Sequence, residues 1–377
     1  MSRITCERGI SYDQKREVYY LYMDLGRDDY GHRLRQYRTF PTLSAARKAR
    51  NTFQLQRNGN AFRSSADLTL DQWLEEWMRE IVIPNRAGTT IYGYQCMIKN
   101  YISPMLGDIL LQDLCPKDLQ HYYSQLLEEK QLGANTVRHH HALLSAALHA
   151  ALRQDLIPRC VTDRVEPPRF IPKETAYYTA EHLKKLYQLI EGHPLETVVR
   201  LAGSLGLRRE EICGLRWDSV DFGHRKLYIR AARTTAGAEI IEKETKNRSS
   251  SRVLHMSDEI YRLLVREWNT QRARAQAMGT DWPDSRLVIV DVDGVPLSPN
   301  RLTGAFSSFI RSNGLPPLTL HGLRHTFATV ASSQGAPLFD IGKALGHSTP
   351  STTGRIYTHL SDQFHTETLS KVAAALK

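Results

Sequence analysis

Two stretches that disfavour regular secondary structure divide this chain of 377 residues into three segments. Residues 57–67 are polar and contain glycine, and residues 165–173 contain three prolines. Proline has no amide hydrogen to donate, and it biases the preceding residue away from the helical conformation. The length allows two or three domains of ordinary size. We therefore expect a multidomain protein, mainly α-helical with small β-sheets, with domains at residues 1–64, 68–160 and 174–377.

The first segment has the pattern of a small sheet followed by a helix. Residues 17–25 are rich in aromatic and β-branched side chains, and residues 33–40 return as a basic strand after a turn at residues 28–31. A helix is predicted from residue 42 to residue 56. We predict a three-stranded sheet packed on this helix, with arginine and tyrosine side chains on its exposed face.

Positive charge is concentrated in the same segment. The chain carries a formal net charge of +10, and residues 1–64, with 13 Lys and Arg against 6 Asp and Glu, contribute +7 of it. A basic domain can serve solubility alone, but this concentration is more typical of nucleic-acid binding, because contacts of Lys and Arg with phosphates dominate that affinity. The candidate DNA contacts are Arg33, Arg35, Tyr37 and Arg38.

The second segment is predicted to be helical, and the third to combine helices with a few strands. Apolar residues recur at helical spacing from Leu70 to Trp77, and further helices begin near residues 89, 115 and 135, the last running to residue 153. The elements predicted for the third segment are helices at 180–191, 196–205 and 208–216, strands at 226–231, 238–243 and 252–256, and helices from there to the end.

The sequence predicts no disulfide framework, metal site or membrane span. The five cysteines are far apart and odd in number, and no apolar run approaches the roughly 20 residues that cross a bilayer. Three consecutive histidines, His139 to His141, would point in divergent directions on a helix, and residues 291–294 lack the remaining ligands of a calcium loop. We expect a cytoplasmic protein without a metal or other cofactor.

Four short segments of the third domain contain the residue types that phosphoryl transfer requires. Each has an ordinary explanation alone: Arg208 and Glu211 are spaced as a surface ion pair, His321 and Arg324 as neighbours on the helix face opposite the buried one, and a single tyrosine is more often a core residue. Their order and spacing together favour a shared function. The segments are Gly206-Leu207-Arg208-Arg209-Glu210-Glu211, Thr245-Lys246-Asn247-Arg248, His321-Gly322-Leu323-Arg324-His325, and Leu345-Gly346-His347 followed by Thr352 to Leu360.

The series Arg, Lys, His-x-x-Arg, His and Tyr resembles the tyrosine recombinase family, known also as the phage integrase family. The resemblance covers roughly residues 175–360 by motif, and the two preceding segments resemble the layout of integrases with an arm-site domain, which serve temperate phages and conjugative transposons. It implies an arm-site DNA-binding domain at 1–64, a helical core-binding domain at 68–160, and a mixed α+β catalytic domain at 174–377 with a C-terminal tail helix.

By this resemblance Tyr357 is the nucleophile, and Arg208 and Arg324 are the two arginines that hold the phosphate. Two planar guanidinium groups can bind both non-bridging oxygens and stabilise the charge that develops on them, which a metal would otherwise do. Tyrosine has an ordinary pKa near 10, so a base must help, and His321 is the candidate. Lys246 is the candidate acid for the leaving 5′-oxygen.

Two further residues complete the expected site. His347 resembles the family's next histidine, and Glu211 resembles an acidic residue that orients the first arginine. Lys243 or Arg248 could take the place of Lys246 in this match, because both lie close to it in the sequence. A 3′-phosphotyrosine conserves the energy of the cleaved bond, so the resemblance implies rejoining without a nucleotide cofactor, and no phosphate-binding loop of the Gly-x-x-x-x-Gly-Lys type is present.

The resemblance implies a site-specific recombinase that integrates and excises a mobile element. Its expected partners are double-stranded DNA at core and accessory arm sites, an accessory excision or DNA-bending protein, and further copies of the chain. Strand exchange between two duplexes implies a homotetramer on DNA and a largely monomeric protein in solution, associated with the bacterial nucleoid. A tail helix with an apolar stripe would dock on an adjacent protomer through Phe364, Leu369, Val372, Ala373 and Leu376.

Two other functions compete with recombination. A type IB topoisomerase-like enzyme would use the same kind of nucleophile and phosphate clamp, but the separate basic first segment favours an enzyme that contacts more than one DNA site. A non-catalytic DNA-binding regulator would be expected to lack the tyrosine or one of the arginines, and the chain retains Tyr357, Arg208 and Arg324.

Overall fold

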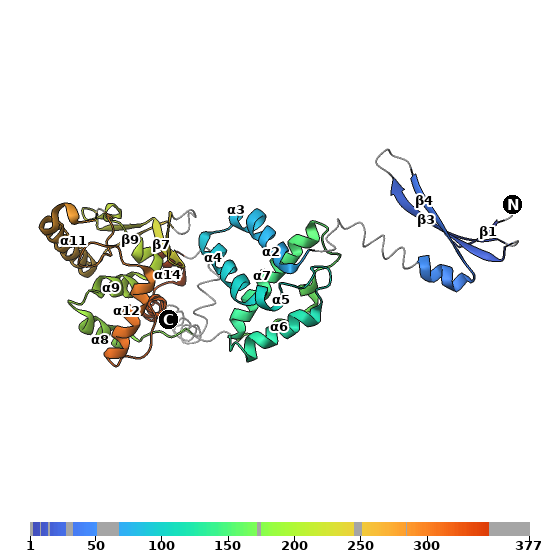
Figure 1. Cartoon of the computed structure of the whole chain (residues 1–377). Helices are drawn as coiled ribbons and strands as arrows, with labels where there is room; N and C mark the ends of the chain where they lie inside the picture. Colours follow the sequence, from blue (N-terminus) through green and yellow to red (C-terminus); the bar gives the residue numbers. More distant parts are fainter. Residues whose placement is uncertain are drawn as a thin grey trace, which may run out of the picture. The chain divides into compact units, whose positions relative to one another are not determined.

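The computed structural model describes residues 3–7, 9–13, 16–27, 33–50, 68–171, 175–244, 251–283 and 285–346 (Figure 1). The chain divides into two compact units, Met1–Ile171 and Pro172–Lys377. Separate clusters of buried apolar side chains occupy the N-terminal sheet, the helices that follow it, and the second unit. None of the described helices combines the length and the apolar character that a membrane span requires.

The N-terminal sheet has four antiparallel strands, so the prediction of three was wrong. The additional strand comes from the first residues, which reverse direction at Gly9 (φ +79°), a backbone conformation that glycine adopts without strain. A strand of only four or five residues gives too short an alternation to be recognised by pattern. The strands, which pair in sequence order, are β1 (Arg3–Glu7), β2 (Ile10–Asp13), β3 (Val18–Arg27) and β4 (Arg33–Phe40).

One face of this sheet packs on a helix. Ile10, Leu21 and Met23 are buried together with Ala46, which lies in the helix described at residues 43–50. The remaining residues of the helix predicted to reach residue 56 lie outside the described chain. Alternate residues of a strand face opposite sides, so burial of this face leaves side chains of the other one available to solvent. Tyr37 of β4 is 56% exposed, as expected for a residue of the outer face.

The second set of elements is helical, as predicted (Figure 1). The helix starts predicted near residues 89, 115 and 135 are confirmed within one residue. Trp73 anchors the core, because it is fully buried and its indole nitrogen donates to the Ala147 carbonyl at 3.0 Å. The elements are α2 (Leu70–Trp77), η1 (Met78–Val82), α3 (Ile83–Asn85), α4 (Gly88–Met97), η2 (Ile98–Ile102), α5 (Ser103–Leu106), α6 (Pro116–Glu128), α7 (Ala134–Arg153) and η3 (Val161–Arg164).

The second unit combines helices with two small antiparallel sheets. One sheet has the order β5-β6-β9, and the other is the hairpin of β7 and β8. Its helices are α8 (Ala180–Ile190), α9 (Glu196–Leu205), α10 (Arg209–Cys213), α11 (Asp258–Met278), α12 (Pro299–Ser312), α13 (Leu320–Ser333) and α14 (Leu338–Leu345), with short turns η4 (Trp217–Ser219) and η5 (Gly279–Asp281). Its strands are β5 (Val220–Asp221), β6 (Lys226–Ile229), β7 (Ala231–Ala236), β8 (Glu239–Glu244) and β9 (Arg252–His255).

Two elements of this unit differ from the sequence prediction. The helix predicted at 208–216 is only the short α10, because the chain must pass close to β7: a Cβ on Gly214 would lie 3.0 Å from the backbone of Ala232 and Arg233. Strand β7 itself was not predicted. Its residues lack an alternating apolar pattern, and the side chain of Arg233 is buried within it.

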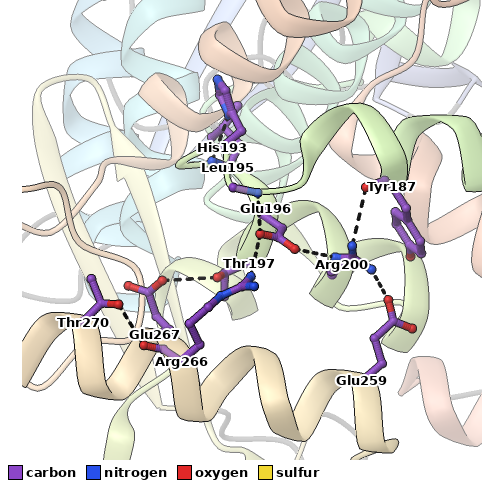
Figure 2. Close-up of polar contacts among 11 residues, drawn as sticks. Tyr187, His193, Leu195, Glu196, Thr197, Arg200, Glu259, Arg266, Glu267 and Thr270 are labelled. Atoms are coloured by element: carbon purple, nitrogen blue, oxygen red, sulfur yellow. Dashed lines mark hydrogen bonds and ion pairs between the residues drawn. The ribbon is translucent and has the colours of Figure 1, made fainter.

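A network of ion pairs around the buried Glu196 joins α11 to α9 (Figure 2). The Glu196 carboxylate accepts hydrogen bonds from the Gly192 amide at 2.9 Å, from Arg200 Nε at 2.9 Å and from Arg266 at 2.6 Å. Arg200 also contacts Glu259, at the start of α11. These contacts satisfy a carboxylate that is only 5% exposed and fix the two helices to each other.

Candidate active site

Arg208 begins the candidate site at the N-terminus of α10. Helix α9 ends at Gly206 (φ +64°), and Arg208 has the extended backbone of an N-cap residue. Its amide donates to one oxygen of the Glu211 carboxylate at 2.9 Å, and its guanidinium donates to the other at 2.8 Å. The pair predicted from the i, i+3 spacing is therefore present, but Arg208 lies before the helix. Its side chain remains one-third exposed, at 33%.

Glu211 is buried between two arginines. Its second partner is Arg252 of β9, which donates to both carboxylate oxygens, at 2.9 and 2.8 Å. Burial alone would raise the pKa of Glu211, but the hydrogen bonds and charge of Arg252, with those of Arg208, hold it below its ordinary value. Glu211 is therefore ionised at neutral pH and can orient Arg208.

Sequence reasoning did not identify Arg252 as a site residue. One signal was available, because Arg252 alternates with Leu254 along β9 and so lies on the same, inner face of the strand. A charged residue at such a position requires a partner of opposite charge. The identity of that partner depends on how the strand meets α10, which no local pattern reveals.

Arg324 lies in the second turn of α13 and is 3% exposed. Its guanidinium donates to the Gly206 carbonyl at 2.7 Å and to the Leu345 carbonyl at 2.6 Å. The prediction that His321 and Arg324 share a helix face opposite the buried one was therefore wrong for Arg324. Burial of this arginine is possible because carbonyl oxygens at the ends of two other helices accept its hydrogen bonds.

The C-terminal end of α14 brings three arginines together. Three consecutive carbonyls accept from different side chains: Ala344 from Arg252 Nε at 2.6 Å, Leu345 from Arg324 at 2.6 Å, and Gly346 from Arg208 at 3.3 Å. The last carbonyls of a helix have no partner within it, and cations are favourable at this end of the helix dipole. Counted over these three arginines and Glu211 alone, the formal charges of the described side chains sum to +2.

His321 lies at the exposed start of α13, close to these arginines. Partial burial of its ring and the nearby Arg324 guanidinium lower the pKa of His321. Its ring lies edge-on to that of His325, with 4.9 Å between centroids, and burial lowers the pKa of His325 to about 4. Both imidazoles are therefore neutral at physiological pH, and a neutral imidazole can accept a proton.

The structure describes only part of the predicted site. It brings together Arg208, Glu211, His321 and Arg324. Of the other candidates, Lys246, His347 and Tyr357 lie outside the described residues, as does the tail after Leu360. In the N-terminal sheet, Tyr37 and Arg38 are exposed on β4, whereas for Arg33 and Arg35 only the strand backbone is described. The prediction of the outer face was wrong for Arg38, which pairs with the buried Leu21 and so lies at the edge of the face that packs on the helix.

One group in the helical part of the first unit brings possible metal ligands together. Atoms of His149, Cys160 and Asp163 lie within 4.8 Å of one another. Hydrogen bonds within the protein already account for this arrangement, since His149 Nδ1 contacts the Ser145 carbonyl at 2.8 Å and Cys160 Sγ contacts the Thr162 hydroxyl at 3.0 Å. The consecutive histidines of α7 diverge: His140 bonds to Tyr122, and His141 to Tyr123.

Comparisons with known protein families agree with the site. The model of the phage integrase family matches residues 177–363, and that of the phage integrase N-terminal SAM-like domain matches residues 69–127. A tyrosine recombinase XerC-like protein of Caldanaerobacter subterraneus is 23% identical over 92% of this chain and 93% of its own length. The ICEBs1 integrase of Bacillus subtilis is 22% identical over 70% of this chain and 72% of its own length.

Solved structures show the same fold. The Tn1549 transposon integrase, in complex with transposon right end DNA, superposes with a TM-score of 0.68 at 21% identity, covering 80% of this chain and all of that one. A lambda integrase dimer bound to a core site covers 94% of this chain and 96% of its own, with a TM-score of 0.58 at 18% identity. The chain thus belongs to the phage integrase family of tyrosine recombinases, the enzymes of site-specific recombination that break and rejoin DNA strands.

Proposed function

We propose that this chain integrates and excises a mobile element, and that it cleaves and rejoins DNA through a covalent bond between Tyr357 and a 3′-phosphate. The observation that carries this proposal is that Arg208 and Arg324 meet at the carbonyls that end α14, beside a neutral histidine. A phosphodiester is an anion whose oxygens gain further charge as the nucleophile attacks. Arginine side chains that are already held in place stabilise that charge without reorganising during the reaction.

The proposed reaction is a transesterification at phosphorus. The phenolic oxygen of Tyr357 attacks the scissile phosphate, its proton passes to His321, and the bond from phosphorus to the 5′-oxygen breaks. Lys246 donates a proton to that oxygen, and Arg208 and Arg324 hold the non-bridging oxygens. His347 directly follows Gly346, whose carbonyl contacts Arg208, and is proposed as a further phosphate contact. Attack of a 5′-hydroxyl from the partner duplex reverses the steps and rejoins the strand.

The domains are proposed to divide the work of DNA binding. Residues 1–64 would bind accessory arm sites through Arg33, Arg35, Tyr37 and Arg38, supported by the exposure of Tyr37 and Arg38 and by the local charge of +7. Residues 68–160 would bind the core site together with the catalytic residues 174–377. The solved relatives are bound to transposon right end DNA and to core-site DNA, in agreement with double-stranded DNA as the partner.

The assembly is proposed to form on DNA. We expect a largely monomeric protein in solution and a homotetramer on two duplexes, in which the segment after Leu360 docks on the adjacent protomer. An accessory excision or DNA-bending protein would set the direction of the reaction. Together these partners would keep the protein in the bacterial cytoplasm, associated with the nucleoid through DNA.

The test of the proposed function is capture of the covalent intermediate. Footprinting on the DNA that flanks the chain's own gene locates the core site, and a nicked duplex of that site is then incubated with the full chain in EDTA. We expect a 3′-phosphotyrosyl adduct with the wild-type protein and none with Tyr357→Phe, which still binds the duplex. An undiminished adduct in the variant would show that Tyr357 is not the nucleophile. Cleavage of any duplex without preference would favour a topoisomerase, and binding without an adduct a regulator.

A further inference from the structure

Arg252 makes three hydrogen bonds from one buried guanidinium. Two of them go to the two oxygens of Glu211, and the third goes from Nε to the Ala344 carbonyl. The side chain is 6% exposed, so these partners replace water completely. Arg252 thereby joins three elements, β9, α10 and the C-terminal end of α14, that lie far apart in the sequence.

We propose that Arg252 is a positioning residue for strand cleavage, which fixes the direction of the Arg208 guanidinium through Glu211 and the end of α14 through Ala344. This rests on the proposed function, in which Arg208 holds the phosphate and Tyr357 follows α14. The two tasks are coupled because one planar group performs both. A displacement of β9 therefore moves the phosphate clamp and the start of the nucleophile's segment together.

The first arm of this arrangement acts on Arg208. Glu211 accepts two hydrogen bonds from Arg208 and two from Arg252, so four donors share one carboxylate. Without Arg252, the buried carboxylate would keep a single cationic partner. It would then either hold Arg208 more tightly, which competes with a phosphate, or take up a proton and cease to orient Arg208. Either outcome weakens the clamp without removing a residue that touches DNA.

The second arm acts on the end of α14. Ala344 is two residues before Gly346, where the helix ends in a left-handed conformation (φ +67°). The three arginines bind three consecutive carbonyls there, and Arg252 is the member whose remaining contacts all go to Glu211. Loss of its contact frees the first of these carbonyls and loosens the point from which the chain continues to His347 and Tyr357.

Only arginine fits this position. A lysine ammonium is a compact charge and cannot present two parallel donors to a carboxylate while a third donor reaches a carbonyl on another side. Arg252→Lys keeps the positive charge and so separates geometry from charge. We expect Arg252→Ala to slow cleavage about 10- to 100-fold, in the range of a displaced catalytic group, and Arg252→Lys to lose a smaller part of the rate.

The experiment measures adduct formation in a single turnover, with the full chain in excess over the nicked core-site duplex. Arg200→Ala is the matched control, because it also breaks a buried ion pair with a glutamate, in the network between α9 and α11 (Figure 2). Both variants are assayed well below their unfolding temperatures, and their DNA affinity is measured in parallel. We expect a slow rate with unchanged affinity for Arg252→Ala, and a wild-type rate for Arg200→Ala.

A pH profile distinguishes positioning from general support of the fold. In Arg252→Gln the pKa of Glu211 rises, because burial is no longer offset by the lost arginine, so the cleavage rate falls further as the pH is lowered. The double variant Arg252→Gln, Glu211→Gln has no carboxyl group to protonate at this position and lacks that extra dependence.

Three outcomes would overturn the proposal: wild-type cleavage by folded Arg252→Ala, equal losses in Arg252→Ala and Arg200→Ala, or identical pH profiles in the single and double variants. If Arg252→Ala does not fold, the cleavage rate of Arg252→Lys and the pH profile of the double variant test the proposal instead. The proposed function fails separately, by persistence of the adduct in Tyr357→Phe.

Discussion

Two buried glutamates of the second unit have almost the same surroundings and different consequences. Glu196 and Glu211 are 5% and 4% exposed, and each lies in the first turn of a helix. Each accepts a hydrogen bond from a preceding backbone amide, at 2.9 Å, and each binds two arginines, of which one lies three or four residues away and the other comes from a distant element. The two carboxylates are therefore alike in burial and in their number of arginine partners, although Arg252 is 6% exposed and Arg266 is 57% exposed.

The difference lies in what the arginines do with their other donors. Arg200 also contacts Glu259 and donates to the Tyr187 carbonyl, so its other donors bind groups on α8 and α11 (Figure 2). Its two acidic members, Glu196 and Glu259, equal its two arginines in number. Arg208 and Arg252 turn instead to the carbonyls at the end of α14, which carry only partial charge. Among the described residues, the candidate site therefore has more arginines than carboxylates, whereas the network between α9 and α11 has equal numbers.

This comparison separates a structural ion pair from a functional one by charge balance. A network whose charges are matched stabilises the contact of two helices and offers nothing to an anion. A network with more arginines than carboxylates, held rigidly by carbonyls, is the arrangement that we propose to bind a phosphate. Three predictions test how far the distinction holds.

The largest expected difference concerns Arg324→Ala. Removal of this arginine deletes the proposed phosphate contact and the links from α13 to Gly206 and Leu345, so we expect adduct formation to slow by about 10²-fold to 10³-fold. Arg200→Ala, in the matched network, is expected to cleave at the wild-type rate. The single-turnover assay on a nicked core site measures both. Comparable cleavage by the two variants would mean that charge balance does not identify the active network.

A smaller difference is expected when each glutamate is replaced by glutamine. Glu211→Gln leaves the buried Arg252 without its counter-charge and is expected to reduce the free energy of unfolding by about 3–5 kcal/mol. Glu196→Gln should cost less, because Arg200 keeps its contact with Glu259 and Arg266 is 57% exposed; urea titration measures both. Only Glu211→Gln is expected to slow cleavage, by about tenfold or more, because Arg208 loses its orientation. Loss of cleavage in Glu196→Gln at a temperature where that variant is folded would contradict the comparison.

The sequence predicted which residues form the site better than it predicted the contacts between them. The starts of α10 and α13, where Arg208 and His321 lie, were predicted from local sequence patterns. The tie from Arg252 to Glu211 could not be predicted, since it depends on β9 meeting α10 in three dimensions. The network of Glu196 was missed for the same reason.

Burial of charge was the second property that local patterns did not reveal. Periodicity assigns polar residues to the outside, so Arg324 was expected on a polar helix face and is instead 3% exposed. Its burial is stable because two helices, α9 and α14, end beside it. The carbonyls of Gly206 and Leu345 at these ends have no partner within their own helices and accept its hydrogen bonds. These hydrogen bonds form only in the assembled fold, and the local sequence around Arg324, Gly206 or Leu345 does not predict them.

The smallest expected effect is on the free energy of unfolding at acidic pH, where both networks should respond in the same way. Burial alone would raise the pKa of both carboxyls, but their arginines and backbone amides hold each one below its ordinary value. An unfolded chain therefore binds more protons than the folded one as the pH falls toward and below 4.5, so the stabilisation present at neutral pH is lost on acidification.

Replacement of either glutamate by glutamine removes its share of this proton uptake. For each variant we expect the slope of unfolding free energy against pH to decrease by at most about 1.4 kcal/mol per pH unit, the limit for one proton. Glu181→Gln, at an exposed position of α8, controls for the change in net charge. Urea titrations between pH 3.5 and pH 6 would measure the slopes at roughly half-unit intervals. A reduced slope in Glu196→Gln alone would mean that Glu211 is already protonated in the folded chain, and its role in orienting Arg208 would have to rest on a neutral hydrogen bond.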